Sequence, residues 1–240
     1  MLRSHSSKPQ PLKIVVLGES QVGKTCFIDM FLQGKHYIRH PAVDSELLSR
    51  TVSHADETWQ LSFMDVDLNG SLAPSYQSMI DSYLATAHGI ILMYDMTLGY
   101  SFDSVIAEPY LHTWYCRNTV FTKDPATRRL IGTKKRFGCV LVGNKADLAK
   151  GDTATATRRH VHADTAAQWA ASQGMRHFEI TANARGDVDA VVTALVESIL
   201  RARRMDARDA AAAADASKSC SPNKHDVPCI MSLLKRATKH

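Results

Sequence analysis

The sequence predicts an α/β protein with a six-stranded, mostly parallel β-sheet, one antiparallel edge strand and helices on both faces. Short runs rich in β-branched residues alternate with helical patterns, as expected when crossover helices join parallel strands. Residues 12–17 (LKIVVL) and 89–95 (GIILMYD) are nearly all apolar, which is typical of strands buried on both faces. These observations favour a sheet enclosed between two layers of helices.

The expected strands and helices follow one another in a regular order. Strands are expected at residues 12–17, 50–55, 59–65, 89–95, 138–143 and 176–180. Helices are expected at residues 24–33, 76–87, 101–115, 160–173 and 187–203. The turn Ala55-Asp56-Glu57 would join the second and third strands in a hairpin. That hairpin would supply the antiparallel edge strand.

The chain is long enough for one globular domain with flanking segments, because it has 240 residues of which 45% are hydrophobic. We expect a flexible N-terminus at residues 1–11, a folded domain at 12–204 and a disordered basic tail at 205–240. Residues 117–137 show neither the helical nor the strand spacing of apolar residues, and they predict a basic surface insertion in the domain. Five scattered cysteines without paired spacing favour a reduced protein of the cytoplasm.

The net charge of +5 is confined to the end of the chain. Residues 201–240 contain nine Lys or Arg and four Asp or Glu, whereas residues 1–200 are neutral. A neutral body argues against nucleic-acid binding, and the basic tail favours peripheral contact with the anionic cytoplasmic face of a membrane. Cys229-Ile230-Met231-Ser232 matches a prenylation box, which has to stand at the C-terminus to be modified. Because Leu233 to His240 follow it, we expect the tail to contact the membrane through its charge and not through a prenyl group.

A phosphate-loop pattern, G-x-x-x-x-G-K-[ST], comes directly after the first expected strand. The matching residues are Gly18, Glu19, Ser20, Gln21, Val22, Gly23, Lys24 and Thr25, and Cys26 continues into the expected helix. The glycines let backbone N–H groups converge on a phosphate, and the helix N-terminus adds positive potential. Lys24 would neutralise the β- and γ-phosphates, and the Thr25 hydroxyl would bind Mg²⁺. The motif therefore predicts a nucleoside-phosphate site.

A second motif, Asn144-Lys145-Ala146-Asp147, follows the buried strand at residues 138–143. The Asp147 carboxylate can accept hydrogen bonds from N1–H and the amino group of guanine, donors that adenine lacks on that edge. Thr181, Ala182 and Asn183 follow the last strand, where their backbone N–H groups would reach guanine O6. These segments predict guanine rather than adenine recognition and disfavour an ATP-dependent enzyme.

Together these motifs make the chain resemble a Ras-type small GTPase over about residues 12–203. The resemblance implies the P-loop NTPase fold, binding of GDP or GTP with Mg²⁺, and two switch segments that reorganise with the γ-phosphate. It also implies a guanine nucleotide exchange factor, effector proteins and a GTPase-activating protein as partners. By resemblance, Asp65 supports Mg²⁺ at the end of the third strand. Lys24 and Asn69 would act in catalysis, with Asn69 replacing the glutamine that positions water.

Three positions depart from the family pattern where it senses the γ-phosphate. Leu68 stands where the D-x-x-G glycine belongs, although Gly70 follows two residues later. The switch threonine is replaced by Val43 or Ala42, depending on the alignment. Asn69 is one methylene shorter than glutamine, and it is either a weak catalytic group or a solvated loop residue without a catalytic part. We therefore predict a GDP/GTP signalling switch with slow intrinsic GTP hydrolysis, and the alternative is a non-catalytic GTP-binding scaffold.

Overall fold

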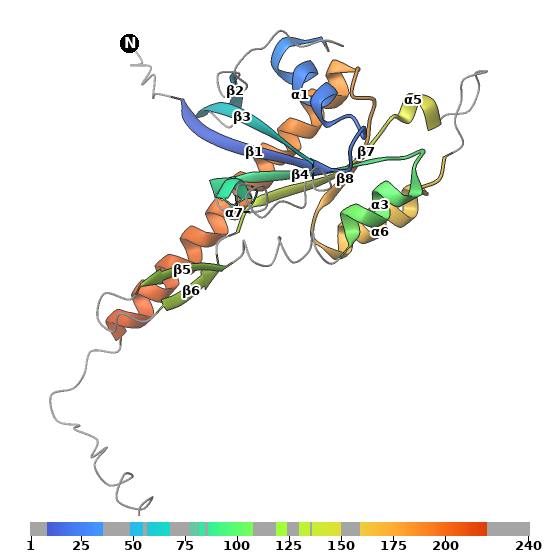
Figure 1. Cartoon of the computed structure of the whole chain (residues 1–240). Helices are drawn as coiled ribbons and strands as arrows, with labels where there is room; N and C mark the ends of the chain where they lie inside the picture. The colour runs from blue at the N-terminus through green and yellow to red at the C-terminus, as the bar shows by residue number, and fades with distance from the viewer. Residues whose placement is uncertain are drawn as a thin grey trace, which may run out of the picture. The chain divides into compact units, whose positions relative to one another are not determined.

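The computed structural model describes residues 9–35, 49–54, 57–67, 78, 80, 82–84, 86–107, 119–123, 130–134, 136–149 and 159–219. The chain divides into two compact units, Met1–Arg203 and Arg204–His240, and each is considered by itself. Figure 1 shows the course of the chain.

The main sheet has six strands in the order β2-β3-β1-β4-β7-β8 (Figure 1). They are β1 Gln10–Gly18, β2 Ser49–His54, β3 Glu57–Asp67, β4 Gly89–Asp95, β7 Gly138–Asn144 and β8 Arg176–Glu179. Every neighbouring pair is parallel except β2–β3, which is antiparallel and places β2 at the edge. The predicted fold class is therefore confirmed, including its antiparallel edge strand.

Helices cover both faces of this sheet because the strands carry apolar side chains on both sides. The helices are α1 Lys24–Gln33, α3 Gly99–Ile106, α5 Ala146–Ala149, α6 Ala163–Ser172 and α7 Arg185–Ser219. On β1, Leu12, Ile14 and Val16 pack with residues of α1 and α7, whereas Val15 and Leu17 pack with residues of α3 and α6. Successive strand side chains point to opposite faces, so one apolar strand serves two cores.

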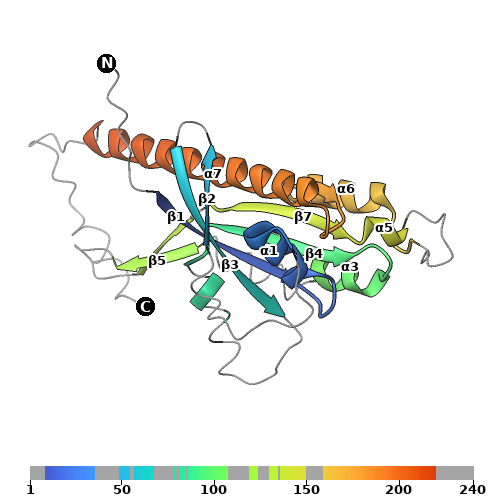
Figure 2. The same ribbon diagram turned by 90° about the horizontal axis from the view of Figure 1, so that it is seen from above.

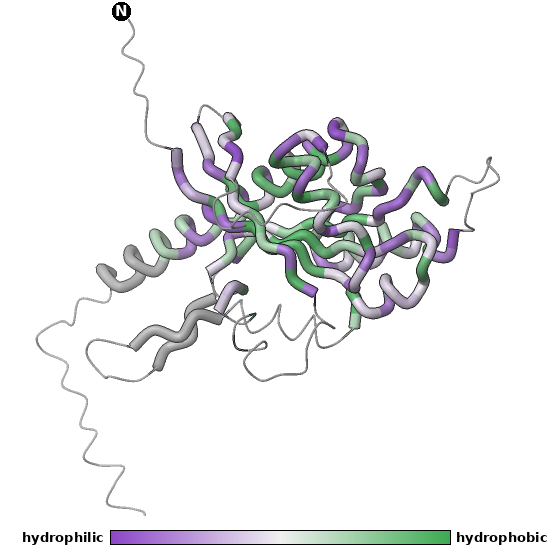
Figure 3. Tube along the Cα trace, turned by 45° about the horizontal axis from the view of Figure 1, so that its top comes forward, coloured by the Kyte–Doolittle hydropathy of each residue, from purple (hydrophilic) through white to green (hydrophobic). Residues whose placement is uncertain are grey.

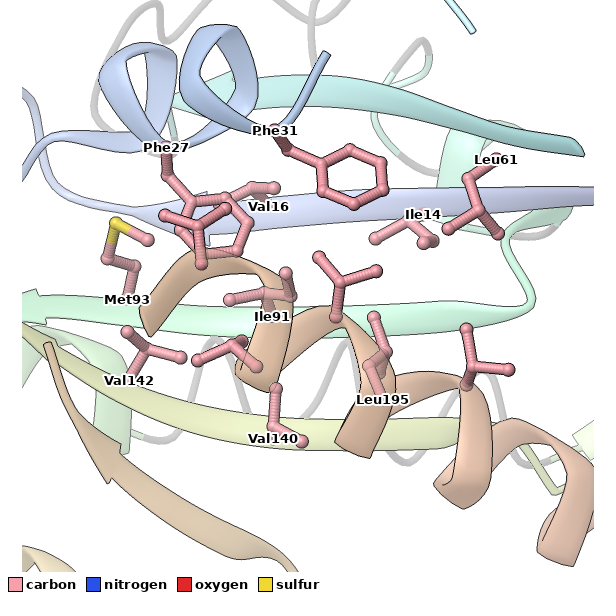
Figure 4. Close-up of a cluster of buried hydrophobic side chains, with 14 of the residues drawn as sticks. Ile14, Val16, Phe27, Phe31, Leu61, Ile91, Met93, Val140, Val142 and Leu195 are labelled. Atoms are coloured by element: carbon pink, nitrogen blue, oxygen red, sulfur yellow. The ribbon is translucent and has the colours of Figure 1, made fainter. Parts of the chain in front are cut away.

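The core between the sheet, α1 and α7 is built around aromatic and β-branched side chains. Figure 4 shows Phe27 and Phe31 of α1 over Val16 and Ile14 of β1. Leu195 of α7 lies over the neighbouring strands β4 and β7. Figure 3 shows hydrophobic residues concentrated along the strands of the main sheet. Figures 1 and 2 place α3, α5 and α6 near the end of the sheet where β4 and β7 end. The packed cores thus hold these strand ends in fixed positions.

The segment expected to be a basic surface insertion contains regular structure. Residues Thr119–Lys123 (β5) and Leu130–Lys134 (β6) form an antiparallel two-stranded sheet separate from the main one. The helix expected at 101–115 is α3 and ends at Ile106, while residues 108–118 lie outside the described part of the chain. These strands were missed because each is only five residues long and ends in a lysine, and a glycine interrupts the second, which hides the strand period.

The last helix corrects the expectation of disorder for residues 205–219, whereas residues 220–240 of the predicted tail lie outside the described part of the chain. It begins at Arg185 and continues to Ser219, although disorder was expected from residue 205. Ala210 to Ala214 are strong helix formers, and adding residues to an established helix requires no new nucleation. At the other end of the chain, β1 begins at Gln10, two residues before its predicted start. Among the described residues, no helix combines the length and apolar character that crossing a membrane requires.

Candidate functional site

The loop between β1 and α1 carries the phosphate-loop motif, and close contacts explain its two glycines. A Cβ at Gly18 would lie 2.2 Å from the backbone oxygen of Met93, so no side chain fits there. Gly23 has φ 101°, and a Cβ there would lie 2.2 Å from Nδ2 of Asn144. Gln21 adopts φ 65° without being glycine, which is an uncommon backbone conformation. The loop is therefore folded tightly against β4 and the end of β7.

Lys24 is held by the carbonyl groups of its own loop. Its Nζ donates hydrogen bonds to the backbone oxygens of Gly18 (3.0 Å) and Glu19 (2.7 Å). The same nitrogen lies 3.8 Å from Oδ1 of Asp65, and the Lys24 side chain is buried. A buried cation is thus fixed beside the backbone N–H groups of the loop, as a phosphate site requires.

Asn144 connects the phosphate loop to the segment after β8. Its Nδ2 donates to the backbone oxygen of Val22 (2.8 Å), and its Oδ1 accepts from the backbone N–H of Ala182 (2.9 Å). The side chain is buried, so both polar ends of the amide are satisfied inside the protein. Three segments far apart in sequence are therefore joined through one amide.

Asp147 and Thr181 form a reciprocal pair at the exposed rim of the site. The Asp147 backbone N–H donates to Thr181 Oγ1 (3.2 Å), whose hydroxyl donates to Asp147 Oδ1 (3.3 Å). The backbone N–H of Thr181 in turn donates to Oδ2 of Asp187 at the start of α7 (3.0 Å). The Thr181 and Ala182 N–H groups expected at guanine O6 therefore already have partners, and binding O6 would require them to share or exchange these bonds.

Cys26 and Asn183 bring α1 against the segment after β8. Burial raises the pKa of the Cys26 thiol, with further increases from the carboxylates of Asp29 and Asp147. The thiol is therefore protonated and donates to Oδ1 of Asn183 (2.8 Å). The site residues predicted on α1, after β7 and after β8 thus lie around one position.

Lys145 forms an ion pair with a residue that lies outside both sequence motifs. Its backbone is left-handed (φ 66°), and its Nζ lies 2.7 Å from Oδ2 of Asp95 at the end of β4. Asp95 and Asp187 are the two carboxylates that the sequence analysis missed. The signal for Asp95 was present, because an acidic residue ends the otherwise apolar strand at residues 89–95.

Comparison with known proteins decides the identity of this arrangement. The family model described as "Ras family" matches residues 13–201. The chain belongs to the Ras family.

The chain is similar to proteins from distant organisms. Ras-related protein RABA3 of Arabidopsis thaliana is 27% identical over 188 residues, which cover 78% of this chain and 68% of that protein. Intraflagellar transport protein 27 of Chlamydomonas reinhardtii is 28% identical over 193 residues, or 79% of this chain and 84% of that protein. Ras-related protein Rab-30 of Homo sapiens is 29% identical over 178 residues, or 74% of each. Such identities mark a divergent small GTPase.

Ras-family proteins typically use Mg²⁺, and the chain provides oxygen ligands suited to it. The Thr25 hydroxyl donates to Oδ2 of Asp65 at 2.5 Å, which brings a hydroxyl and a carboxylate together beside the phosphate loop. Mg²⁺ prefers few protein oxygens and takes its other ligands from phosphate and water. Within the described residues, no group of three His, Cys, Asp or Glu side chains forms a metal cage. The pair therefore fits Mg²⁺ in a nucleotide complex.

The positions predicted from the sequence to sense the γ-phosphate lie outside the described residues. They include Ala42, Val43, Leu68, Asn69 and Gly70. Ser20, in contrast, is described and has an exposed position in the phosphate loop. The roles of Asn69 and of the two switch segments stay predictions from the sequence.

Proposed function

We propose that this Ras-family protein is a GDP/GTP signalling switch with slow intrinsic GTP hydrolysis. The observation that carries the proposal is the double contact of Asn144 with Val22 and Ala182 (2.8 and 2.9 Å). Because one side chain fixes the phosphate loop relative to the base-reading segment, a nucleotide that touches both finds them already placed. Such preorganisation favours tight binding because little ordering remains to be done.

Base selectivity would come from the Asp147 carboxylate. Its Oδ1 is oriented by Thr181, and the side chain is exposed at the rim of the site, where a base can reach it. Guanine offers two donors to such a carboxylate, and adenine offers neither on the corresponding edge. A site built to accept hydrogen bonds rejects analogues that lack the donors by large factors.

The phosphates would contact the backbone of residues 18–25 and the Lys24 ammonium. Thr25 and Asp65 would hold Mg²⁺, which when bound neutralises charge on the phosphate oxygens. Lys24 is already fixed by two carbonyl groups, so it can meet phosphate charge without losing side-chain freedom at that moment. This chain's own contribution to hydrolysis is therefore mainly positioning and charge.

Slow hydrolysis follows from the departures in the family pattern. Leu68 and Val43 or Ala42 lack the groups that normally contact the γ-phosphate, and Asn69 is shorter than glutamine. The Ser20 side chain would also crowd the attacking water and an incoming arginine. The same departures favour a second candidate function, a scaffold protein that binds GTP without hydrolysing it.

We expect purified protein to carry guanine nucleotide and to hydrolyse GTP at or below the intrinsic Ras rate, about 10⁻⁴ s⁻¹. Mass spectrometry of the released nucleotide identifies the ligand, and single-turnover phosphate release gives the rate.

Leu68→Gly combined with Asn69→Gln should raise the rate of GTP hydrolysis only a few-fold, because the switch threonine is still missing.

The rate measurement separates the two candidate functions. Slow release of phosphate from GTP supports the switch. Phosphate release no faster than in buffer without protein supports the scaffold. Release of adenine nucleotide only, or rapid hydrolysis by the wild type, would contradict the proposal.

Regulators and location complete the proposal. A switch of this kind works with an exchange factor and effectors, and a GTPase-activating protein would compensate for the weak catalytic residues. We place the protein in the cytoplasm, with its basic C-terminal segment in peripheral contact with an anionic membrane. Arg208 is exposed on the part of α7 that belongs to this segment, residues 205–240.

Removing the segment after residue 204 should abolish binding to anionic vesicles. Each basic residue near such a surface contributes about 1 kcal/mol, so several give weak and salt-sensitive binding. Sedimentation with vesicles containing phosphatidylserine compares the full chain with residues 1–204, and phosphatidylcholine vesicles are the control. Equal sedimentation of the two chains, or binding that salt leaves unchanged, would exclude the tail as the membrane contact.

A further inference from the structure

Asp95 is a buried carboxylate that neither nucleotide-binding motif includes. It ends β4, its side chain is 1% exposed, and it lies opposite Asn144 in the β4–β7 register. An ionised carboxylate at that depth is strongly unfavourable unless opposite charge and hydrogen bonds compensate it. The groups that contact Asp95 must therefore supply this compensation.

The compensation comes from one ammonium group and one threonine. Lys145 Nζ lies 2.7 Å from Oδ2 of Asp95. The backbone N–H and the hydroxyl of Thr97 donate to Oδ1 at 2.8 and 2.7 Å. The backbone N–H of Asp95 donates to Ser101 Oγ (3.0 Å), which ties the strand end to α3. Both carboxylate oxygens are engaged, and the residue is held rigidly at its backbone as well.

This rigid carboxylate constrains a residue of the base-reading motif. Lys145 is partly exposed (28%) and carries a long side chain that would otherwise sample many rotamers. Its left-handed backbone lies between Asn144 and the start of α5, which contains Asp147. Fixing the Lys145 ammonium therefore restricts the segment that carries both the connecting amide and the base-reading carboxylate.

We propose that Asp95 is a positioning residue for guanine-nucleotide binding, which it supports by holding Lys145; this inference rests on the proposed function. Asp95 does not touch the nucleotide. It orders the segment 144–147 before binding, so that the bound state loses less freedom and the nucleotide leaves more slowly.

Asp95→Asn tests the role while preserving the shape of the side chain. The amide can still accept from Thr97, but it presents no charge to Lys145 and turns a donor toward another donor. We expect GDP dissociation, followed with a fluorescent GDP analogue, to become about tenfold faster, within the usual coupling between contacting residues. Thr97→Val, which removes one donor and keeps the ion pair, should give an increase of about threefold.

Lys145→Met distinguishes positioning from a general structural role. It removes the ammonium and keeps most of the side-chain stem, so Asp95→Asn and Thr97→Val should each change the rate less than about twofold in that background. Glu197→Gln is the control, because it makes the same carboxylate-to-amide change in an exposed ion pair with Arg176 (3.0 Å) at the start of β8, away from residues 144–147. It should leave the dissociation rate unchanged.

The outcomes separate this inference from the proposed function on which it rests. Unchanged dissociation in both Asp95→Asn and Thr97→Val, or equal acceleration with and without the Lys145 ammonium, would overturn the positioning role. If Asp95→Asn does not fold, the Thr97→Val pair of measurements decides alone. Failure of the wild type to bind GDP would instead contradict the guanine-nucleotide function.

Discussion

Asp147→Asn should transfer the base preference of this protein from guanine to xanthine. One acceptor oxygen becomes a donor that faces the donors of guanine, whereas the extra carbonyl of xanthine suits that donor. The new amide can still accept from the Thr181 hydroxyl through Oδ1, which lies 3.3 Å from Thr181 Oγ1 in the wild type. The local fold is therefore retained while recognition changes. We expect GDP affinity to fall by about 10²- to 10³-fold, since lost base-edge hydrogen bonds have effects of this order or larger.

Competition between GDP and xanthosine diphosphate for a fluorescent nucleotide measures the change in preference. Asp164→Asn is the matched control, because Asp164 is an exposed aspartate in the first turn of α6. It makes the same chemical substitution away from the motif and should leave both affinities unchanged. If Asp147→Asn bound GDP as tightly as the wild type does, another group would have to read the base.

The sheet could be predicted from the sequence because its strands are locally distinctive. The run at residues 138–143 is apolar enough to require burial on both faces, and the structure buries every residue of β7. The limits of α7 could not be predicted in the same way. Its apolar stripe ends near Ile199, and Arg203 still lies over the Trp59 ring of β3, while the later residues continue as helix through alanine-rich intrinsic preference.

The site was predictable where its residues are contiguous and was missed where they meet across the fold. Asn144 and Asp147 could be assigned from their spacing, because the end of a parallel strand fixes where they lie. Asp95 contacts Lys145, which is 50 residues away in sequence. No local pattern records this contact, because the register between β4 and β7 creates it.

Gly23→Ala should abolish tight nucleotide binding. Gly23 has φ 101°, where an alanine is strained by about 1–2 kcal/mol. The added Cβ would lie 2.2 Å from Nδ2 of Asn144 and would displace the amide from the backbone oxygen of Val22. Losing a buried hydrogen bond costs about 1–3 kcal/mol more. Because about 1.4 kcal/mol corresponds to tenfold, GDP affinity should fall by about a hundredfold or more.

Gly186→Ala is the control for this prediction. Gly186 lies in the first turn of α7, and a Cβ there would meet no atom within 4 Å. Alanine is also the better helix former, so this variant should bind GDP normally and unfold at the same or a slightly higher temperature. Calorimetric titration of GDP into both nucleotide-free variants, with thermal unfolding as the measure of folding, makes the comparison. Normal GDP affinity in folded Gly23→Ala would mean that the loop can move away from Asn144, and the connecting amide would then not be required for binding.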